Sequence, residues 1–304
     1  MIYTNKFNLP EPIAKAVLET LGEYDKGKAD ISVTGLWKPP QIRALMEQFG
    51  DTLEQDVSDN IWSVLGSLTH AMLEKAGTNL DSRITEKRFY VEHKGRVISG
   101  KPDTIAIDGW ILEDYKLTPV YSILKGSRDD EWEKQLNTYA WMLRRIENPI
   151  EIKALRVWCI LRDWSKAEAS RNPDYPQRHC LSVDIPLIDD ARMTTLIEEQ
   201  LATHFDRPPR PCTPEEMWER PQVFAVMKPG AKRAVKLCSS QSEAEHWILT
   251  KSKPREEMYV DARPTQRNRC QNYCTVNVVC PQYKAFLSDT PQESSQPKQY
   301  EGML

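Results

Sequence analysis

The sequence lacks the features of a membrane or secreted protein. No stretch of its 304 residues approaches the ~18–20 consecutive apolar residues that a transmembrane helix needs. The first residues, MIYTNKFNLPEP, have neither the charged start nor the apolar stretch of a secretory signal. We therefore expect a cytoplasmic protein without a membrane partner.

A strong charge of one sign is also missing. The formal net charge is -3, so any affinity for nucleic acid would have to come from local patches. The apolar content of 40% and the charged content of 28% are those of an ordinary soluble protein, and no internal repeat is present. A chain of this length can bury a full core in one large domain or two.

Cysteine is absent from the first half of the chain. None of the seven cysteines precedes Cys159, and in an intracellular protein we do not expect a disulfide framework. Three of them, Cys270, Cys274 and Cys280, cluster near the C-terminus.

Hydrophobic periodicity and capping residues predict an α/β protein. We expect helices over 11–21, 41–49, 56–76 (N-cap Ser58), 127–147 (N-cap Ser127), 188–205 and 243–251 (capping box Ser242/Glu245), and strands over 84–92, 96–108, 110–118 and 152–161. The order helix, three strands, helix, strand within 56–161 implies a mixed sheet flanked by helices.

Composition divides the chain into five expected segments. They are an N-terminal helical segment (1–55), a core (56–165), an accessory extension (166–260) containing the Pro-rich linker 208–214, a cysteine-containing segment (261–287), and a polar tail (288–304) that we expect to be disordered.

The most informative stretch is a predicted hairpin. Asp108-Gly109 lies between two β-rich runs, which predicts a two-residue type I′ turn. Counting outward from the turn places Ile105 opposite Leu112 and Asp103 opposite Asp114. Two carboxylates opposite each other repel, so this register suggests that something positive normally lies between them.

Lys116 extends this acidic pair into a candidate catalytic site. It lies two residues beyond Asp114, so strand alternation places both on one face. Carboxylate oxygens hold Mg²⁺ or Mn²⁺, which polarises a phosphate, and a lysine can position the attacking water. The alternative is a strand whose exposed face happens to carry charges.

Two pairs on the flanking helices share a face because they are four residues apart. His70 and Glu74 form the first pair, on the helix before the strands, and could equally be a surface pair. Gln135 and Tyr139 form the second pair, on the helix after the strands.

Together these features resemble the PD-(D/E)XK nuclease superfamily, in particular its RecB-like exonuclease branch. The matching elements are Gly100 with Pro102-Asp103, Asp114-Tyr115-Lys116 after ten intervening residues, His70 in GSLTHAMLE, and Gln135 with Tyr139 in QLNTY. The resemblance covers residues 56–163 and implies a restriction-endonuclease-like core of order α-β-β-β-α-β, with a helical C-terminal region added.

The resemblance also implies a role for each matching residue. Asp103, Asp114, the backbone carbonyl of Tyr115 and His70 would be metal ligands, Lys116 would assist the attacking water, Glu74 would orient His70 or bind through water, and Gln135 and Tyr139 would hold the lysine or contact the DNA backbone.

The cysteine triplet, followed by Pro281, resembles that of iron–sulfur nucleases such as AddB and the CRISPR-adaptation nucleases. Those proteins typically space it C-x2-C-x5-C and add an upstream cysteine. Here the first gap has one extra residue, so a fourth ligand would have to be a late cysteine such as Cys212 or Cys238. A [4Fe–4S] cluster, zinc and metal-free packed thiols all stay open.

A basic stretch before the triplet is a further candidate for DNA contact. It carries Lys228, Lys232, Arg233 and Lys236, although runs of this size are usually solvated surface.

The sequence thus predicts a Mg²⁺-dependent DNA nuclease, most plausibly a phage-type exonuclease that processes DNA ends for recombination or repair in a bacterial cytoplasm. The alternatives are a structure- or site-specific endonuclease and a catalytically silent DNA-binding or assembly protein. Expected partners are linear DNA, duplex or single-stranded, a recombinase or single-strand annealing protein, and further copies of the chain.

Overall fold

The computed structural model describes residues 1–22, 27–126, 129–205, 208–251 and 257–289. The chain forms two compact units. The first comprises residues 1–38 and 54–209, and the second comprises 39–53 and 210–304. Residues 39–53 therefore belong with the C-terminal segments, a grouping that composition did not indicate. Ser127 and the tail beyond 289 lie outside the described residues.

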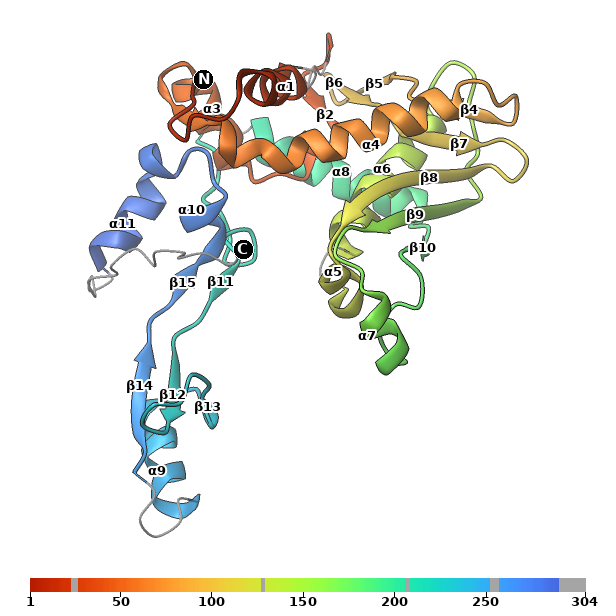
Figure 1. Cartoon of the computed structure of the whole chain (residues 1–304). Coiled ribbons are helices and arrows are strands. Elements are labelled where there is room, and N and C mark those ends of the chain that lie inside the picture. Colours follow the sequence, from red (N-terminus) through yellow and green to blue (C-terminus); the bar gives the residue numbers. More distant parts are fainter. Residues whose placement is uncertain (23–26, 127–128, 206–207, 252–256, 290–304) are drawn as a thin grey trace. The chain divides into compact units, whose positions relative to one another are not determined.

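The first unit is built on a five-stranded mixed sheet (Figure 1). Its order is β10 (Cys180–Ile185), β9 (Ala154–Leu161), β8 (Ile111–Thr118), β7 (Thr104–Ala106) and β4 (Arg83–Thr85). β8 and β9 are parallel, and the other pairs are antiparallel. The chain is therefore a mixed α/β protein, as predicted. β10 lies in the accessory extension (166–260), where no strand was predicted.

A second, three-stranded sheet consists of β2 (Ile31–Ser32), β6 (Arg96–Gly100) and β5 (Phe89–His93), in that order. The prediction of three continuous strands was therefore wrong, because two of them are interrupted and contribute to both sheets. Glu86 has a φ of 50°, which breaks the first strand between β4 and β5. The segment 101–103, with Pro102, separates β6 from β7.

The register of the predicted hairpin is confirmed, and its turn type is wrong. Ile105 pairs with Leu112 as expected. The positive φ of the turn falls on Trp110 (50°), whereas a type I′ turn requires it at Asp108 and Gly109. Both central residues of the hairpin between β5 and β6, Lys94-Gly95, do have positive φ, at 50° and 68°.

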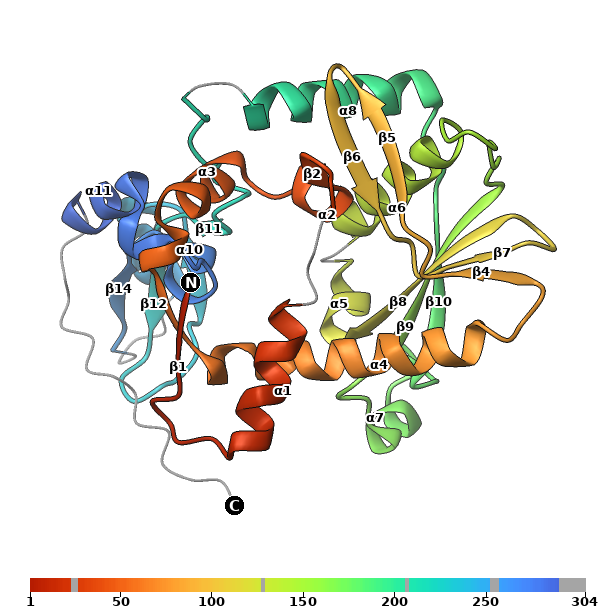
Figure 2. The same ribbon diagram turned by 90° about the horizontal axis from the view of Figure 1, so that it is seen from above.

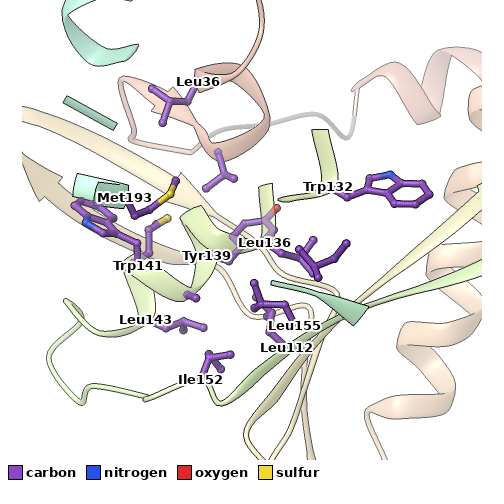
Figure 3. Packing of buried hydrophobic residues seen from close by; sticks show 14 of the residues in the cluster. Leu36, Leu112, Trp132, Leu136, Tyr139, Trp141, Leu143, Ile152, Leu155 and Met193 are labelled. Carbon is purple, nitrogen blue, oxygen red and sulfur yellow. The ribbon is translucent and has the colours of Figure 1, made fainter. Parts of the chain in front are cut away.

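Helices lie on both faces of the five-stranded sheet (Figure 2). α6 (Asp129–Leu143) and α8 (Asp190–Phe205) cover one face, and α4 (Ile61–Gly77) runs along the other. Figure 3 shows the main core, which the first two helices build with the strands through Leu112, Leu136, Trp141, Leu155 and Met193. The unit also contains α1 (Glu11–Gly22), α2 (Val33–Leu36), α5 (Val120–Lys125), α7 (Lys166–Arg171), and the parallel pair β1 (Ile2–Thr4) and β3 (Glu54–Asp56).

The start of α4 differs from the prediction. Residues 57–60 form a 3₁₀ turn, so the helix begins at Ile61 and Ser58 is not its N-cap. The Asp56 carboxylate accepts a hydrogen bond from the Ser58 amide at 3.0 Å and caps this turn instead.

The second unit contains two small sheets. They are β13 (Lys236–Cys238), β12 (Val223–Met227) and β14 (Tyr259–Arg263), and β11 (Glu219–Arg220) with β15 (Gln266–Arg267). Its helices are α3 (Pro40–Phe49), α9 (Gln241–Lys251), α10 (Asn268–Asn272) and α11 (Pro281–Asp289). The cap of α9 lies two residues before the predicted one: Ser240 Oγ accepts from the Glu243 amide, and the Glu243 carboxylate accepts from the Ser239 amide. Within the described ranges, no helix of the chain is both long and apolar enough to span a bilayer.

Candidate functional site

One cavity of the first unit collects the predicted catalytic side chains. It has a volume of about 540 Å³. Its walls include His70, Glu74, Asp103, Asp114, Lys116, Gln135 and Tyr139, which come from α4, the segment before β7, β8 and α6. Residues separated by up to 69 positions in sequence thus line one cavity.

Asp103 lies between the helix and the strand. Its Oδ1 is 3.3 Å from His70 Nδ1, and its Oδ2 accepts a hydrogen bond from the Tyr115 amide at 2.7 Å. The hydrogen bond to Asp103 raises the pKa of His70. The β7–β8 ladder ends one pair earlier, at Thr104 and Glu113, and continuing it places Asp103 opposite Asp114. A ligand role for the Tyr115 carbonyl stays a prediction.

Asp114 is the most buried acid of the cavity, with 3% of its surface exposed. Burial raises its pKa to about 6 even though Lys116 opposes this shift. Lys116 Nζ lies 2.7 Å from Asp114 Oδ2, so the buried carboxylate and the lysine form an ion pair. Burial lowers the pKa of Lys116, but the Asp114 and Asp103 carboxylates outweigh that effect and the net shift is upward.

Gln135 connects the acid, the lysine and the tyrosine. Its Nε2 donates to Asp114 Oδ1 and to Tyr139 Oη, and its Oε1 accepts from Lys116 Nζ, each at 3.4 Å. Gly100 lies against this group. A Cβ at that position would come within 2.9 Å of the Tyr139 ring, so only glycine allows the close approach.

Glu86 belongs to the site although sequence reasoning missed it. One ligand atom each of His70, Glu86 and Asp103 lie within 4.8 Å of one another. Burial raises the pKa of Glu86, and Lys101 Nζ pairs with its Oε2 at 2.5 Å. Glu86 follows β4, which pairs with β7, and its amide donates a hydrogen bond to the Asp103 carbonyl. This strand pairing brings Glu86 into the site, and the sequence alone does not show it.

These donors fit a hard divalent cation. Carboxylate oxygens are the ligands that Mg²⁺ and Mn²⁺ prefer. Burial raises the pKa of Asp114, and a bound cation would stabilise the ionised form of this carboxylate.

The second unit contains a separate cavity, of about 20 Å³, lined by four cysteines. They are the predicted Cys270, Cys274 and Cys280, together with Cys212. Burial raises the pKa of Cys212 to about 12, and the other three cysteines add to this shift. Cys238 lies elsewhere and packs with Val226 and Ala244.

A glutamine of α3 joins two of these cysteines. Gln41 Oε1 accepts a hydrogen bond from the Cys212 amide at 3.0 Å, and its Nε2 donates to Cys280 Sγ at 3.7 Å. The cysteine cavity therefore explains why α3 belongs to the second unit.

The predicted basic stretch also lies in the second unit. Lys232, Arg233 and Lys236 are exposed and Lys228 is half-buried, along the connection from β12 to β13. None of the four lines the acidic cavity.

Comparison with known proteins gives only remote likenesses. No family model and no curated protein matches the chain. The crystal structure of SSO0001 is similar over 66% of this chain and 87% of its own, with 19% identity and a TM-score of 0.44. A phage-related exonuclease from Haemophilus somnus 129PT is similar over 64% of this chain and 80% of its own, with 11% identity and a TM-score of 0.27.

Proposed function

We propose that the chain is a Mg²⁺-dependent DNA nuclease of the RecB-like PD-(D/E)XK type, acting as an exonuclease on DNA ends. One observation supports this most strongly: seven side chains chosen from the sequence for this chemistry line a single cavity. The same cavity holds a buried carboxylate paired with a lysine, a combination suited to metal-assisted hydrolysis of a phosphodiester.

Each residue then has a definite task. Asp103 and Asp114, with His70 and Glu86, would hold the ion, which when bound polarises the phosphate and lowers the pKa of a water molecule. Lys116 donates hydrogen bonds to the attacking water or to the charge that develops on the phosphate. Gln135 holds the lysine in place through its Oε1. Glu74 lines the same cavity, one turn after His70 on α4, and would orient the His70 ring or bind the ion through water.

The alternatives differ in substrate or in activity. A structure- or site-specific endonuclease would use the same residues on internal bonds. A silent DNA-binding or assembly protein would have no need of a buried acid whose pKa is raised to about 6, because such a group costs stability when ionised. An active enzyme is therefore the better reading of the cavity.

The test is degradation of end-labelled linear duplex and single-stranded DNA with Mg²⁺. We expect Asp114→Asn to abolish degradation, while Asp184→Asn, which alters an exposed acid paired with Arg156 outside the cavity, retains it. Undiminished cleavage by Asp114→Asn would refute the assignment. Cleavage of a covalently closed circle would favour the endonuclease. The same assay with a recombinase or single-strand annealing protein added tests for the expected partner.

We also propose a [4Fe–4S] cluster in the cysteine cavity, with Cys212 as the fourth ligand. Tetrahedral zinc, with Zn–S bonds of ~2.3 Å, holds its sulfurs ~3.8 Å apart. Among the described residues, the group whose ligand atoms lie within 4.8 Å of one another is His70, Glu86 and Asp103, and it contains no cysteine. No three of the described cysteine sulfurs therefore lie within 4.8 Å of one another, and a spacing wider than that of tetrahedral zinc favours a ligand several atoms across.

A further inference from the structure

A second wall of the acidic cavity comes from the three-stranded sheet. Alternate residues of β5 and β6, such as Phe89, Val91 and Ile98, are buried in the main core. Strand alternation therefore turns the residues between them toward the opposite face of this sheet. Four polar or basic residues that lie on this face, in the strands or one position beyond their ends, line the cavity: Ser32, Arg88, Ser99 and Lys101. We name these four residues the Arg88 wall.

Two cations of the Arg88 wall lie opposite each other. Phe89 pairs with Gly100, so continuing the β5–β6 ladder by one pair places Arg88 opposite Lys101. Like charges directly opposite each other destabilise a strand pair. The charge of Lys101 is balanced, because its Nζ lies 2.5 Å from Glu86 Oε2. Arg88 is half-buried and forms no ion pair with any residue that the structure describes, so its guanidinium is available to an anion.

The two serines of the Arg88 wall add hydroxyl donors to this charge. Ser32 and Ser99 are neighbours in the parallel pair of β2 and β6. Ser32 Oγ accepts a hydrogen bond from the Gly35 amide at 3.0 Å, and its O–H remains a donor. Ser99 Oγ is buried and has no hydrogen-bond partner within the described ranges. A buried hydroxyl without a partner is costly, and the oxygen of a bound anion would satisfy it.

Glu86 connects the Arg88 wall to the group of candidate metal ligands. Its Oε2 pairs with Lys101, and its Oε1 lies 4.0 Å from His70 Nδ1. The cavity therefore has two neighbouring parts of opposite character. Two acids, Asp103 and Asp114, oppose each other in one part and suit a cation, whereas two bases oppose each other in the other part and suit an anion. A volume of about 540 Å³ has room for both.

We propose that the Arg88 wall is a second phosphate site, at which Arg88 binds a phosphate of the DNA strand other than the one that is cleaved. A guanidinium presents a planar fork of donors that matches two phosphate oxygens. A strand held at the acidic part of the cavity carries a further phosphate one nucleotide away, which the neighbouring basic part can bind. The inference rests on the proposed function for its ligand, and it makes Arg88 a residue that positions substrate.

Binding of a fluorescent single-stranded oligonucleotide to the full chain in EDTA tests the proposal without cleavage. We expect Arg88→Gln to weaken binding about tenfold and to lower the slope of log K against log salt by about 0.7, the contribution of one phosphate contact. Lys87→Gln removes the same charge from the neighbouring exposed residue, which does not line the cavity, and should bind as wild type. Arg88→Lys keeps the charge without the fork and should fall between wild type and Arg88→Gln.

Two further measurements separate binding from folding and identify the phosphate. Ser99→Ala removes a buried hydroxyl that lacks a partner, so its urea midpoint should stay the same or rise while oligonucleotide binding weakens several-fold. If the bound phosphate is terminal, the effect of Arg88→Gln will be confined to strands that carry a 5′- or 3′-phosphate. If it is internal, the effect will be the same on strands with hydroxyl ends.

Kinetics with Mg²⁺ complete the test. Arg88→Gln should raise KM about tenfold and leave kcat within about twofold, because the contact is made equally in the ground state and the transition state. Equal affinity and salt slope for wild type and Arg88→Gln overturn the proposal, as does a wild type that does not bind the strand. A lower kcat at unchanged KM also overturns it. Binding in EDTA that depends on Arg88, together with no cleavage in Mg²⁺, would support the phosphate site and refute the nuclease.

Discussion

The acidic cavity of the first unit and the cysteine cavity of the second differ in how their polar groups are balanced. In the acidic cavity two of the candidate ligand acids already have a lysine neighbour, Lys116 for Asp114 and Lys101 for Glu86, and the Asp103 carboxylate lies 3.3 Å from the His70 ring. In the cysteine cavity the groups are thiols whose pKa burial raises at Cys212, Cys270 and Cys274.

This difference indicates which kind of ligand each cavity is suited to bind. Because Asp114 and Glu86 already have lysine partners, the fold around the acidic cavity would not depend on the proposed ion, which could bind reversibly together with substrate. The cysteine cavity must lose protons to bind a metal, and it joins a linker, α3, α10 and the start of α11, so its ligand would become part of the folded unit. The predictions below test this contrast.

The largest effect is expected in the cysteine cavity. Cys212→Ser should strongly reduce the brown colour and the iron content of anaerobically purified protein, because one iron of the cluster would lose its thiolate ligand. Cys238→Ser is the control, since Cys238 packs away from the cavity. Visible absorption and iron analysis provide the measurement. Full iron content in Cys212→Ser would rule out Cys212 as a ligand. One zinc ion per chain and no iron in the wild-type protein would show that the cavity binds a single ion and not a cluster.

Lys116 should have the next largest effect, on rate. Lys116→Met keeps the length of the side chain and removes its charge, and we expect about a 10²–10³-fold lower rate of DNA hydrolysis, as for loss of one preorganised donor. Lys134→Met, which breaks an exposed pair with Asp130 on α6, should stay near wild type. Single-turnover assays at saturating Mg²⁺ measure the rate. Equal rates for both variants would show that Lys116 only balances charge.

Glu86 should have a smaller effect, on metal affinity. Glu86→Gln removes one carboxylate from the group around His70 and Asp103, and we expect the half-saturating Mg²⁺ concentration to rise about 10–100-fold, as for other groups that support a metal site. Glu92→Gln alters an exposed acid of the nearby strand β5 and serves as the control. An unchanged Mg²⁺ requirement would remove Glu86 from the site.

Sequence predicted the parts of the site that local rules determine. The register of β7 against β8 follows from side-chain alternation and loop length, and it brings Asp103 and Asp114 together even though the turn places its positive φ on Trp110. Helical spacing pairs His70 with Glu74 and Gln135 with Tyr139, and the resemblance described above assigned these pairs to the site. Strand register and helical spacing depend on residues that are close in sequence, which is why the sequence could predict them.

The remaining features depend on contacts that a single sequence does not display. Glu86 joins the site because a left-handed residue interrupts the first strand, and nothing in the side chain of a glutamate predicts that conformation. Cys212 lies in a Pro-rich segment that predicts a linker, yet a contact with Gln41, 171 positions away, places it in the cysteine cavity. The apolar periodicity of α4 predicts a core-facing helix, and only the fold shows that Trp62, Leu68 and Met72 are exposed.

The smallest predicted effect is the contribution of Asp114 to the pH dependence of the free energy of unfolding. The pKa of Asp114 is raised from 3.8 to about 6, so the folded protein binds this proton more tightly than the unfolded chain. Stability of the metal-free protein should therefore fall as pH rises from about 4 through 6, by on the order of 1–2 kcal/mol. Asp114→Asn removes the titrating group and should remove that part of the slope.

Urea unfolding in EDTA at pH 5 and pH 7.5 measures this difference between wild type and variant. Added Mg²⁺ should stabilise wild type at pH 7.5 and have a much smaller effect on Asp114→Asn, because a bound ion replaces the proton on the same carboxylate. If both proteins lose stability equally between the two pH values, the cost of the buried carboxylate is already offset by Lys116. The acidic cavity would then be balanced by its lysine alone, and would need neither the proton nor the ion to be stable.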